Sequence, residues 1–492
     1  MGDFGRLGPE LGLLIAAGVI VVVDALLPLA GKRAWGARHS ITIALALIGV
    51  FASMGASLAL VLSDEQGPAF DGMIATDDFS LFFAFLFAGV AGMIVLGSID
   101  FLQRNRFHAE YLALVLTASA AMMLMAASLD LVMIFVALET QAIAFYVLVG
   151  FSKNEKSGEA ALKYLMLGAV STALTLYGMA YLFGLSGETS LDGIASYVDS
   201  ADSSTRTGLV LATVFLAGGL GFKMAVVPFQ MWVPDVYQGA PTPVTAYLSV
   251  ASKAAGFAVV MRIFLIGLGE GVISSDWANM FAAISAVSMT LGNLMALGQT
   301  DIKRMLGYSS IAQAGTFLIG LAAVAAHNPQ MELGSSSVIF FLGTYAFTNL
   351  GAFLAIIAIS NKIVSDNISD YAGIYKRSPL LALGLAACLI SLTGIPPTAG
   401  FWGKVYVFNA AVQADLVWLA LVGVLNGVIS AYYYLRVVLY MFTRDPETET
   451  AFKPNMGLGL ALAIAVLGLF AIGIYPTPLI EASESAARVF AA

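Results

Sequence analysis

Charged residues are scarce in this chain, and cysteine is almost absent. Only 11% of the 492 residues are charged, whereas soluble domains carry about 25%. The single cysteine, Cys388, cannot supply the four thiolates of an iron–sulfur cluster or a structural zinc site. The three histidines, His39, His108 and His327, fall in polar connecting stretches, so we expect no buried pair of haem ligands. The composition excludes a soluble globular protein and places any redox chemistry outside this chain.

Apolar runs fill most of the sequence. Hydrophobic residues make up 59% of the chain, and the mean hydropathy is +0.88. Because a membrane span needs about 20 mostly apolar residues, we predict an all-α polytopic membrane protein with fourteen transmembrane helices. The predicted spans lie near residues 9–30, 41–62, 79–99, 109–127, 131–151, 161–184, 208–236, 241–267, 277–298, 305–325, 335–360, 379–411, 416–442 and 456–475.

Basic residues gather in alternate loops, and acidic residues gather in the loops between. Most of the 23 Lys and Arg residues follow this alternation. Positively charged loops stay in the cytoplasm, so both termini are predicted on the non-cytoplasmic side of a bacterial cytoplasmic membrane. No basic stripe suited to nucleic acid is visible.

A few basic residues lie inside the apolar spans. A charge at the bilayer centre costs roughly 2.5–3.5 kcal/mol on insertion scales, so each one needs a reason. Arg262 and Arg436 lie near helix ends and are predicted to extend to the headgroups. Lys163 either does the same or pairs with Glu159 one turn earlier.

Four other charged residues are predicted too far from the helix ends to reach the headgroups. Glu139, Lys253 and Lys404 lie near the middle of their runs, and Lys223 joins them if 208–236 is one interrupted helix. A buried lysine loses its proton more readily than one in water, and a nearby carboxylate opposes that loss. Glu139 is therefore predicted to modulate Lys223 in a proton relay, with Lys253 next and Lys404 last. A metal site is less favoured, because lysine is a poor ligand.

Prolines predict a break in two of these helices. Pro228 follows Lys223, while Pro396 and Pro397 precede Lys404. Proline removes a backbone donor, and a broken helix at membrane depth must be buried in protein or line a wet cavity. Alternatively, prolines are simply frequent in membrane helices.

The two breaks are five spans apart, which suggests an inverted repeat of helices 4–8 and 9–13, with helices 7 and 12 interrupted. The chain would then divide into residues 1–107, with three N-terminal helices; 108–268, the first repeat; 275–442, the second repeat; and 443–492, helix fourteen and the tail.

The charged residues and helix breaks stand within a set of distinctive motifs: Ala137–Glu139, Ala161–Leu165, Val233–Val244, Ser252–Gly256, Lys303–Ser310 and Gly394–Lys404. Together these motifs resemble the antiporter-like subunit N of respiratory complex I and its counterpart in the photosynthetic complex I of cyanobacteria and plastids. The resemblance implies a proton path through Glu139, Lys223, Lys253 and Lys404, and it makes Lys163 the helix-six lysine of the family. It also implies other membrane-arm subunits as partners. FMN, iron–sulfur clusters and quinone are expected in those partner subunits, and no cofactor in this chain.

Two departures from the family pattern stand out. Gln230 and Gln313 occupy positions where many bacterial subunit N sequences have histidine. Glutamine binds water but does not titrate, so we expect both to line a water path. Gln313 is closer to the photosynthetic relatives, which leaves NADH and ferredoxin open as electron donors.

Two other functions compete with this interpretation. An Mrp-type cation/proton antiporter shares the broken helices and lysines but has no redox partner. A scaffold with static ion pairs would need more carboxylates, because only Glu139 is available mid-span to three central lysines.

Overall fold

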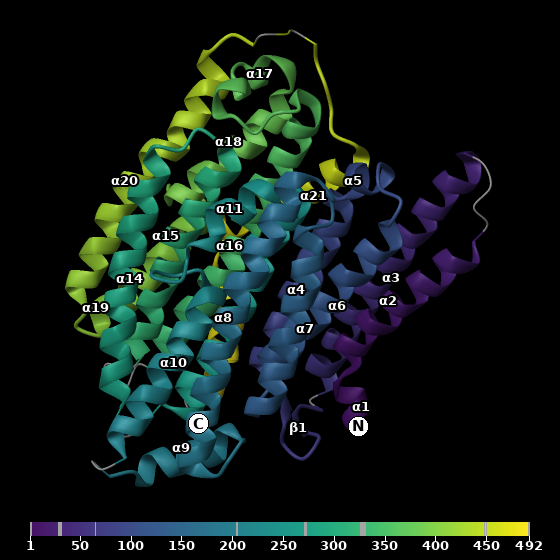
Figure 1. The fold of residues 1–492 in the computed structure, drawn as a ribbon. Helices are drawn as coiled ribbons and strands as arrows, with labels where there is room; N and C mark the ends of the chain where they lie inside the picture. Colours follow the sequence, from purple (N-terminus) through teal and green to yellow (C-terminus); the bar gives the residue numbers. More distant parts are fainter. Residues whose placement is uncertain are drawn as a thin grey trace.

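The chain folds as a bundle of long helices (Figure 1). The computed structural model describes residues 2–27, 32–63, 65–202, 205–269, 273–324, 331–446, 448 and 450–490. His327 lies outside the described residues. Thirteen helices in the described part are long and apolar enough to cross a membrane. The N- and C-terminal ends lie at the same end of the bundle, near the β-hairpin and α9 (Figure 1).

Twelve of these thirteen candidate spans are single helices. They are α2 (Gly8–Leu26), α3 (Lys32–Ser63), α4 (Asp78–Gly97), α6 (His108–Ala127), α7 (Leu131–Val149), α8 (Glu155–Ser186), α10 (Arg206–Met224), α14 (Ser274–Leu297), α15 (Ile302–Val324), α16 (Met331–Ile363), α20 (Val417–Thr443) and α21 (Met456–Ile474). The thirteenth is continuous but changes its hydrogen-bond pattern through α12 (Thr242–Tyr247), the π-helix η1 (Leu248–Ser252), α13 (Lys253–Met261) and the π-helix η2 (Arg262–Gly267).

The remaining elements are short. They are α1 (Asp3–Arg6), α5 (Ile99–Gln103), α9 (Leu191–Ser200), α11 (Trp232–Gly239), α17 (Ile374–Arg377), α18 (Pro379–Thr393), α19 (Ala399–Gln413), α22 (Thr477–Ala487) and the 3₁₀ turns η3 (Ile368–Tyr371) and η4 (Arg488–Phe490). Strands β1 (Gly67–Ala69) and β2 (Ile74–Thr76) form an antiparallel hairpin in which Gly67 pairs with Thr76.

Polar caps separate the apolar runs and start the spans. Asp77 forms a capping box with Ser80 at the start of α4, and Asp130 caps α7 by accepting from Val132 N at 2.8 Å. Asn154 caps α8 in the same way. Such side chains satisfy the free N–H groups of the first turn. α4 and α7 begin within one residue of the predicted starts, whereas α8 begins at Glu155, six residues before the predicted 161.

The structure shows an interruption at both predicted places. α10 ends at Met224, and Ala225 adopts a left-handed conformation with φ 63° before α11 begins at Trp232. The predicted span 379–411 consists of α18 and α19, each of 15 residues and separated by Gly394 at φ 92°. Neither half is long enough to be a candidate span alone.

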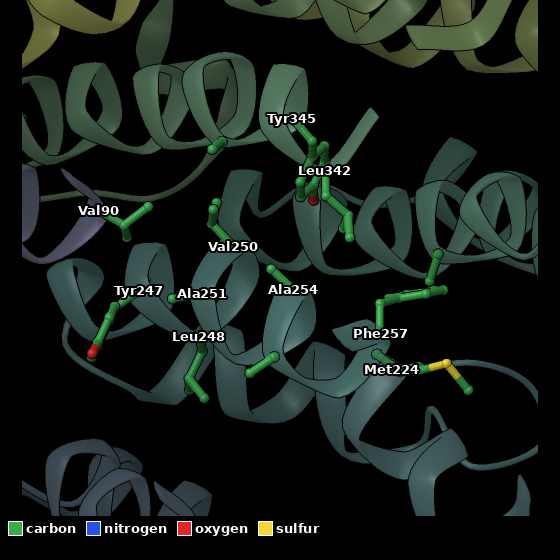
Figure 2. Close-up of a cluster of buried hydrophobic side chains, with 14 of the residues drawn as sticks. Val90, Met224, Tyr247, Leu248, Val250, Ala251, Ala254, Phe257, Leu342 and Tyr345 are labelled. Carbon is green, nitrogen blue, oxygen red and sulfur yellow. The ribbon is translucent and has the colours of Figure 1, made fainter. Parts of the chain in front are cut away.

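The centre of the bundle surrounds α13. The spans containing α13, α15 and α16 are almost entirely buried, whereas α2, α3, α8 and α21 leave most of their surface uncovered. Figure 2 shows the apolar side of this centre, where Ala254 and Phe257 of α13 belong to the same cluster of buried side chains as Leu342 and Tyr345 of α16. Any charged group on α13 is therefore enclosed by protein.

The prediction that Arg262 extends to the headgroups is wrong. Its side chain is 0% exposed, and it donates to both Asp77 carboxylate oxygens at 2.8 Å and to Ala126 O at 2.9 Å. The guanidinium also lies over the Phe79 ring. Asp77 directly follows the hairpin and caps α4. Apolar spans alone do not indicate that its carboxylate lies beside η2.

Arg436 also differs from its prediction. It donates to Leu297 O at 3.1 Å and Gln299 O at 2.6 Å, so it binds the C-terminal end of α14 instead of headgroups. Cations are stabilised at helix C-termini because unpaired carbonyls carry partial negative charge there.

The placement of two histidines in connecting stretches is also wrong. His39 lies within α3 and His108 begins α6; both are buried, and their rings stack at 3.9 Å between centroids. His39 Nε2 lies 2.9 Å from Leu102 O, and His108 Nε2 lies 3.2 Å from Asp24. The close packing of α2, α3 and α6 brings these rings together.

Replacing Arg262 with Gln should lower the stability of the protein by about 3–5 kcal/mol, because it leaves the Asp77 carboxylate without its charged partner in a largely buried site. Arg206→Gln is the matched control. It breaks an exposed pair with Asp276 on the same face, which is expected to contribute about 1 kcal/mol or less. Thermal inactivation of the purified assembly would compare them, and equal effects of the two variants would contradict the assignment.

Candidate functional site

Glu139 lies on the outward side of α7. It is half-buried, next to the exposed residues Val136 and Ile143, and its Oε1 accepts from Thr172 Oγ1 of α8 at 2.6 Å. Among the described residues, the Glu139 carboxylate and the Lys223 ammonium group form no ion pair within 4.0 Å. The carboxylate can therefore act on the lysine only across a gap.

Lys223 lies in the last turn of α10, next to the break. It is 3% exposed, and its Nζ has no hydrogen-bond partner among the described residues. Gly256 of α13 allows the close approach of the two helices, because a Cβ there would lie 3.2 Å from Lys223 Cβ. The neighbouring carbonyl of Phe222 at the end of α10 is already bound by Ala225 N and by the Trp232 indole nitrogen.

Lys253 is the first residue after the π-helix η1. It is 2% exposed. Its Nζ donates to the carbonyl oxygen and to the Oγ of Ser310 on α15, the latter at 2.6 Å. Ser310 Oγ also lies 3.2 Å from the Tyr237 hydroxyl, and it accepts from the Tyr345 hydroxyl at 3.3 Å. Three polar side chains thus converge on one serine.

The π-helix before Lys253 is surrounded by amides. Gln141 of α7 donates to Ser252 Oγ at 2.8 Å, and Asn349 of α16 donates to Ser249 Oγ at 2.8 Å. The oxygen atoms of both amides are buried without a partner in the described structure. Such atoms usually bind ordered water, and π-turns are frequent at functional sites.

Lys404 of α19 binds the end of the preceding half-helix. Its Nζ donates to Leu392 O at 3.0 Å and Thr393 O at 2.8 Å, the last carbonyls of α18. Gln313 Nε2 donates to the same Leu392 oxygen at 3.2 Å, while Gln313 Oε1 has no partner among the described residues. A narrow cavity of about 10 Å³, enough for about one water molecule, adjoins Lys404 and is lined by Gln313, Tyr345, Thr348, Ser391 and Gly400.

The other predicted site residues lie nearer the surface. Lys163 is 43% exposed and binds Glu159 at 2.7 Å and Asp235 at 2.9 Å. The predicted pair with Glu159 is therefore present, but Lys163 lies apart from Lys223, Lys253 and Lys404. Gln230 is half-buried in the first break, and its Oε1 has no described partner.

The breaking prolines lie on the outside of the chain. The side chains of Pro228, Pro396 and Pro397 are all exposed. They interrupt the helices but do not line the cavity beside Lys404. Within the described ranges, no three His, Cys, Asp or Glu side chains gather to hold a metal ion.

Residues 128–430 match the family described as NADH:quinone oxidoreductase/Mrp antiporter, transmembrane. NADH-quinone oxidoreductase subunit N of Dehalococcoides mccartyi is 43% identical over 98% of both chains. NAD(P)H-quinone oxidoreductase subunit 2 of Nostoc is also 43% identical, over 90% of this chain and 85% of that protein.

The chain belongs to the subunit N family. Its fold also matches a chain of respiratory complex I from Thermus thermophilus with bound aureothin, with a TM-score of 0.79 and 30% identity over 96% of this chain and 98% of that one. The resemblance carried by the sequence motifs is thereby confirmed.

In this member of the subunit N family, several polar residues around the lysines were not predicted from the sequence. Gln141, Ser252, Ser310, Tyr345 and Asn349 are uncharged, so the insertion cost that singled out the lysines did not mark them. A weaker signal was present, because Ser309, Ser310 and Gln313 interrupt an otherwise apolar span. Only tertiary packing places these side chains beside a lysine.

The close approach at Gly256 can be tested by adding a side chain. Gly256→Leu should destabilise the protein by about 1–3 kcal/mol through overpacking and displace the end of α10. Gly427→Leu on α20 is the control, because a Cβ there meets nothing within 4 Å. Assembly yield and thermal stability of the purified complex would be measured. A Gly256 variant as stable as the control would contradict the packing.

Proposed function

We propose that this subunit moves protons through Glu139, Lys223, Lys253 and Lys404, with each lysine charged and discharged in turn. The chain is a membrane-arm subunit of a complex I type, proton-pumping quinone oxidoreductase, as its relatives are named. Quinone reduction in other subunits would start a charge rearrangement that reaches Glu139 through lateral contacts. That residue lies on the outward side of α7, where a neighbouring antiporter-like subunit can approach.

One observation carries the proposal. Among the described residues, the central lysines have no carboxylate within ion-pair distance: Lys253 and Lys404 bind carbonyls and a hydroxyl, and Lys223 Nζ has no hydrogen-bond partner. A static ion-pair scaffold would hold each ammonium permanently charged. Neutral partners stabilise a charge only partly, so these lysines can release a proton without stranding an opposite charge.

The contacts also suggest a route between the last two stations. A proton leaving Lys253 Nζ can pass to Ser310 Oγ. Once the Tyr345 hydroxyl reverses the hydrogen bond that it donates to this oxygen, it can accept the serine's own proton. Tyr345 lines the cavity beside Lys404, where water could complete the transfer. Gln313 would orient that water through its free oxygen, in place of a titrating histidine.

The proposed architecture has fourteen spans, with α18 and α19 together forming the twelfth. The inverted repeat is supported by equivalent packing, because α10 and α11 both contact α8 while α18 and α19 both contact α16. The left-handed residue also precedes a proline by three positions in each break, at Ala225 and Gly394. Residues 1–107, 108–268, 275–442 and 443–492 would be the four units.

The loop charges favour both termini on the non-cytoplasmic side of the bacterial cytoplasmic membrane. FMN, iron–sulfur clusters and quinone would belong to partner subunits. An Mrp-type antiporter is the alternative function, since the family description includes it. Sodium-driven proton exchange in vesicles without quinone-reducing partners would favour that alternative.

Lys223→Ala should abolish proton transport through this subunit and slow coupled quinone reduction, because the relay loses its second station. Glu139→Ala should act in the same direction. The assembled complex in sealed vesicles would be assayed for both activities, with the loop variant Lys153→Ala as control. Full pumping by either mutant would rule out the relay.

Ser310→Ala tests the link between the two repeats. It removes the hydroxyl shared by Lys253, Tyr237 and Tyr345, so pumping should fall by about tenfold or more, as expected when a positioned proton-transfer group is lost. Ser285→Ala is the matched control, a fully buried serine that donates to Gly315 O at 2.6 Å. If the two variants pump equally well, the route does not pass through Ser310.

A further inference from the structure

A second charged cluster lies where α8, α11 and α15 meet, outside the buried group of lysines. Asp235 of α11 accepts from Lys163 Nζ of α8 at 2.9 Å. It also accepts from Arg304 Nη1 of α15 at 2.6 Å. We call these three side chains the Asp235 clamp. One carboxylate thus joins a half-helix to a helix from each of the two repeats.

The other contacts of α11 reinforce this arrangement. Gln238, nearly one turn after Asp235, accepts from Arg304 at 3.3 Å and donates to Asp301 at 3.0 Å. Gly239 packs directly on α8, because a Cβ there would lie 2.7 Å from Ala160 Cβ. A helix of eight residues is not stable alone. Its position therefore depends on these neighbours.

The half-helix is linked in turn to the relay. Trp232, the first residue of α11, donates from its indole nitrogen to Phe222 O at 3.1 Å. Phe222 directly precedes Lys223. A displacement of α11 would therefore shift the end of α10, where the Lys223 ammonium group lies.

Lys163 has room to change partners within the Asp235 clamp. It binds Glu159 as well as Asp235. A hollow of about 260 Å³ lies beside it, lined by Lys156, Glu159, Ala160, Asp235, Gln238 and Gly239. Because Lys163 is 43% exposed, it can move between the two carboxylates without crossing the protein interior.

We propose that Asp235 is a positioning residue for the relay: its pairs with Lys163 and Arg304 set the place of α11, and through Trp232 the place of Lys223. We call Lys163 a holding charge, because its ammonium group holds α11 through the ion pair with Asp235 and can shift to pair with Glu159. It does not carry protons along the relay. This inference rests on the proposed function, since it concerns the placement of a relay lysine.

The test uses the assembled complex in sealed vesicles. Asp235→Asn removes the carboxylate that lies between Lys163 and Arg304, so their like charges repel although Glu159 still pairs with Lys163. Coupled pumping should fall by about twofold or more. Asp235→Glu should restore it, because the charge returns. Asp445→Asn, which breaks the exposed pair of Asp445 with Lys376, is the control and should pump normally.

The double variant Asp235→Asn/Lys163→Gln decides between the two roles of Lys163. If Lys163 is a holding charge, removing it relieves the repulsion, and pumping should recover above that of Asp235→Asn alone. If Lys163 is a station, the double variant pumps no better, and the proposal is overturned. Assembly on native gels is read in the same series. Should Asp235→Asn fail to assemble, recovery of assembly in the double variant supports the proposal, and no recovery overturns it.

Failure of the relay itself gives a different result. In that case Lys223→Ala would pump normally, whatever the Asp235 variants do. Normal pumping by Asp235→Asn, with Lys223→Ala inactive, would overturn the Asp235 clamp alone.

Discussion

The rest of the structure depends on how the lysine ammonium groups are stabilised away from water, although no carboxylate of the described residues binds them. In the described residues, Lys404 binds the final carbonyls of α18, Lys223 lies at the end of α10, and Lys253 binds the carbonyl and hydroxyl of Ser310. A helix that stops inside the bundle leaves its last carbonyls unpaired, and those carbonyls attract a cation. The break after α18 therefore supplies the partial negative charge that Lys404 binds.

This arrangement constrains the packing around it. A half-helix can end inside the bundle only if other elements approach closely enough to enclose it. Gly256 permits that approach at Lys223, and Gly403 does so near Lys404, where a Cβ would lie 2.5 Å from the Phe341 ring. The almost complete burial of the spans containing α13, α15 and α16 follows from the same need. Buried amide oxygens on Gln141 and Asn349, which have no partner in the described part of the chain, then mark places where water can enter an otherwise apolar centre.

Much of the fold and the charged residues of the site could be predicted from the sequence, because both produce strong local signals. Apolar length located the spans, and proline with glycine located both breaks. The cost of burying charge singled out Lys223, Lys253 and Lys404. Partners remote in sequence could not be predicted: Arg262 was expected at the headgroups because nothing local indicates that Asp77 lies beside it. The same holds for Ser310, whose side chain is uncharged, and for the stacked pair of His39 and His108.

The most direct test is a density map of the assembled complex at a resolution that shows ordered water. The account predicts a file of water molecules touching Lys223 Nζ and the free oxygens of Gln141 and Gln313, and continuing into the cavity beside Lys404. A dry interior there, or a carboxylate from a partner chain bound directly to each lysine, would contradict it.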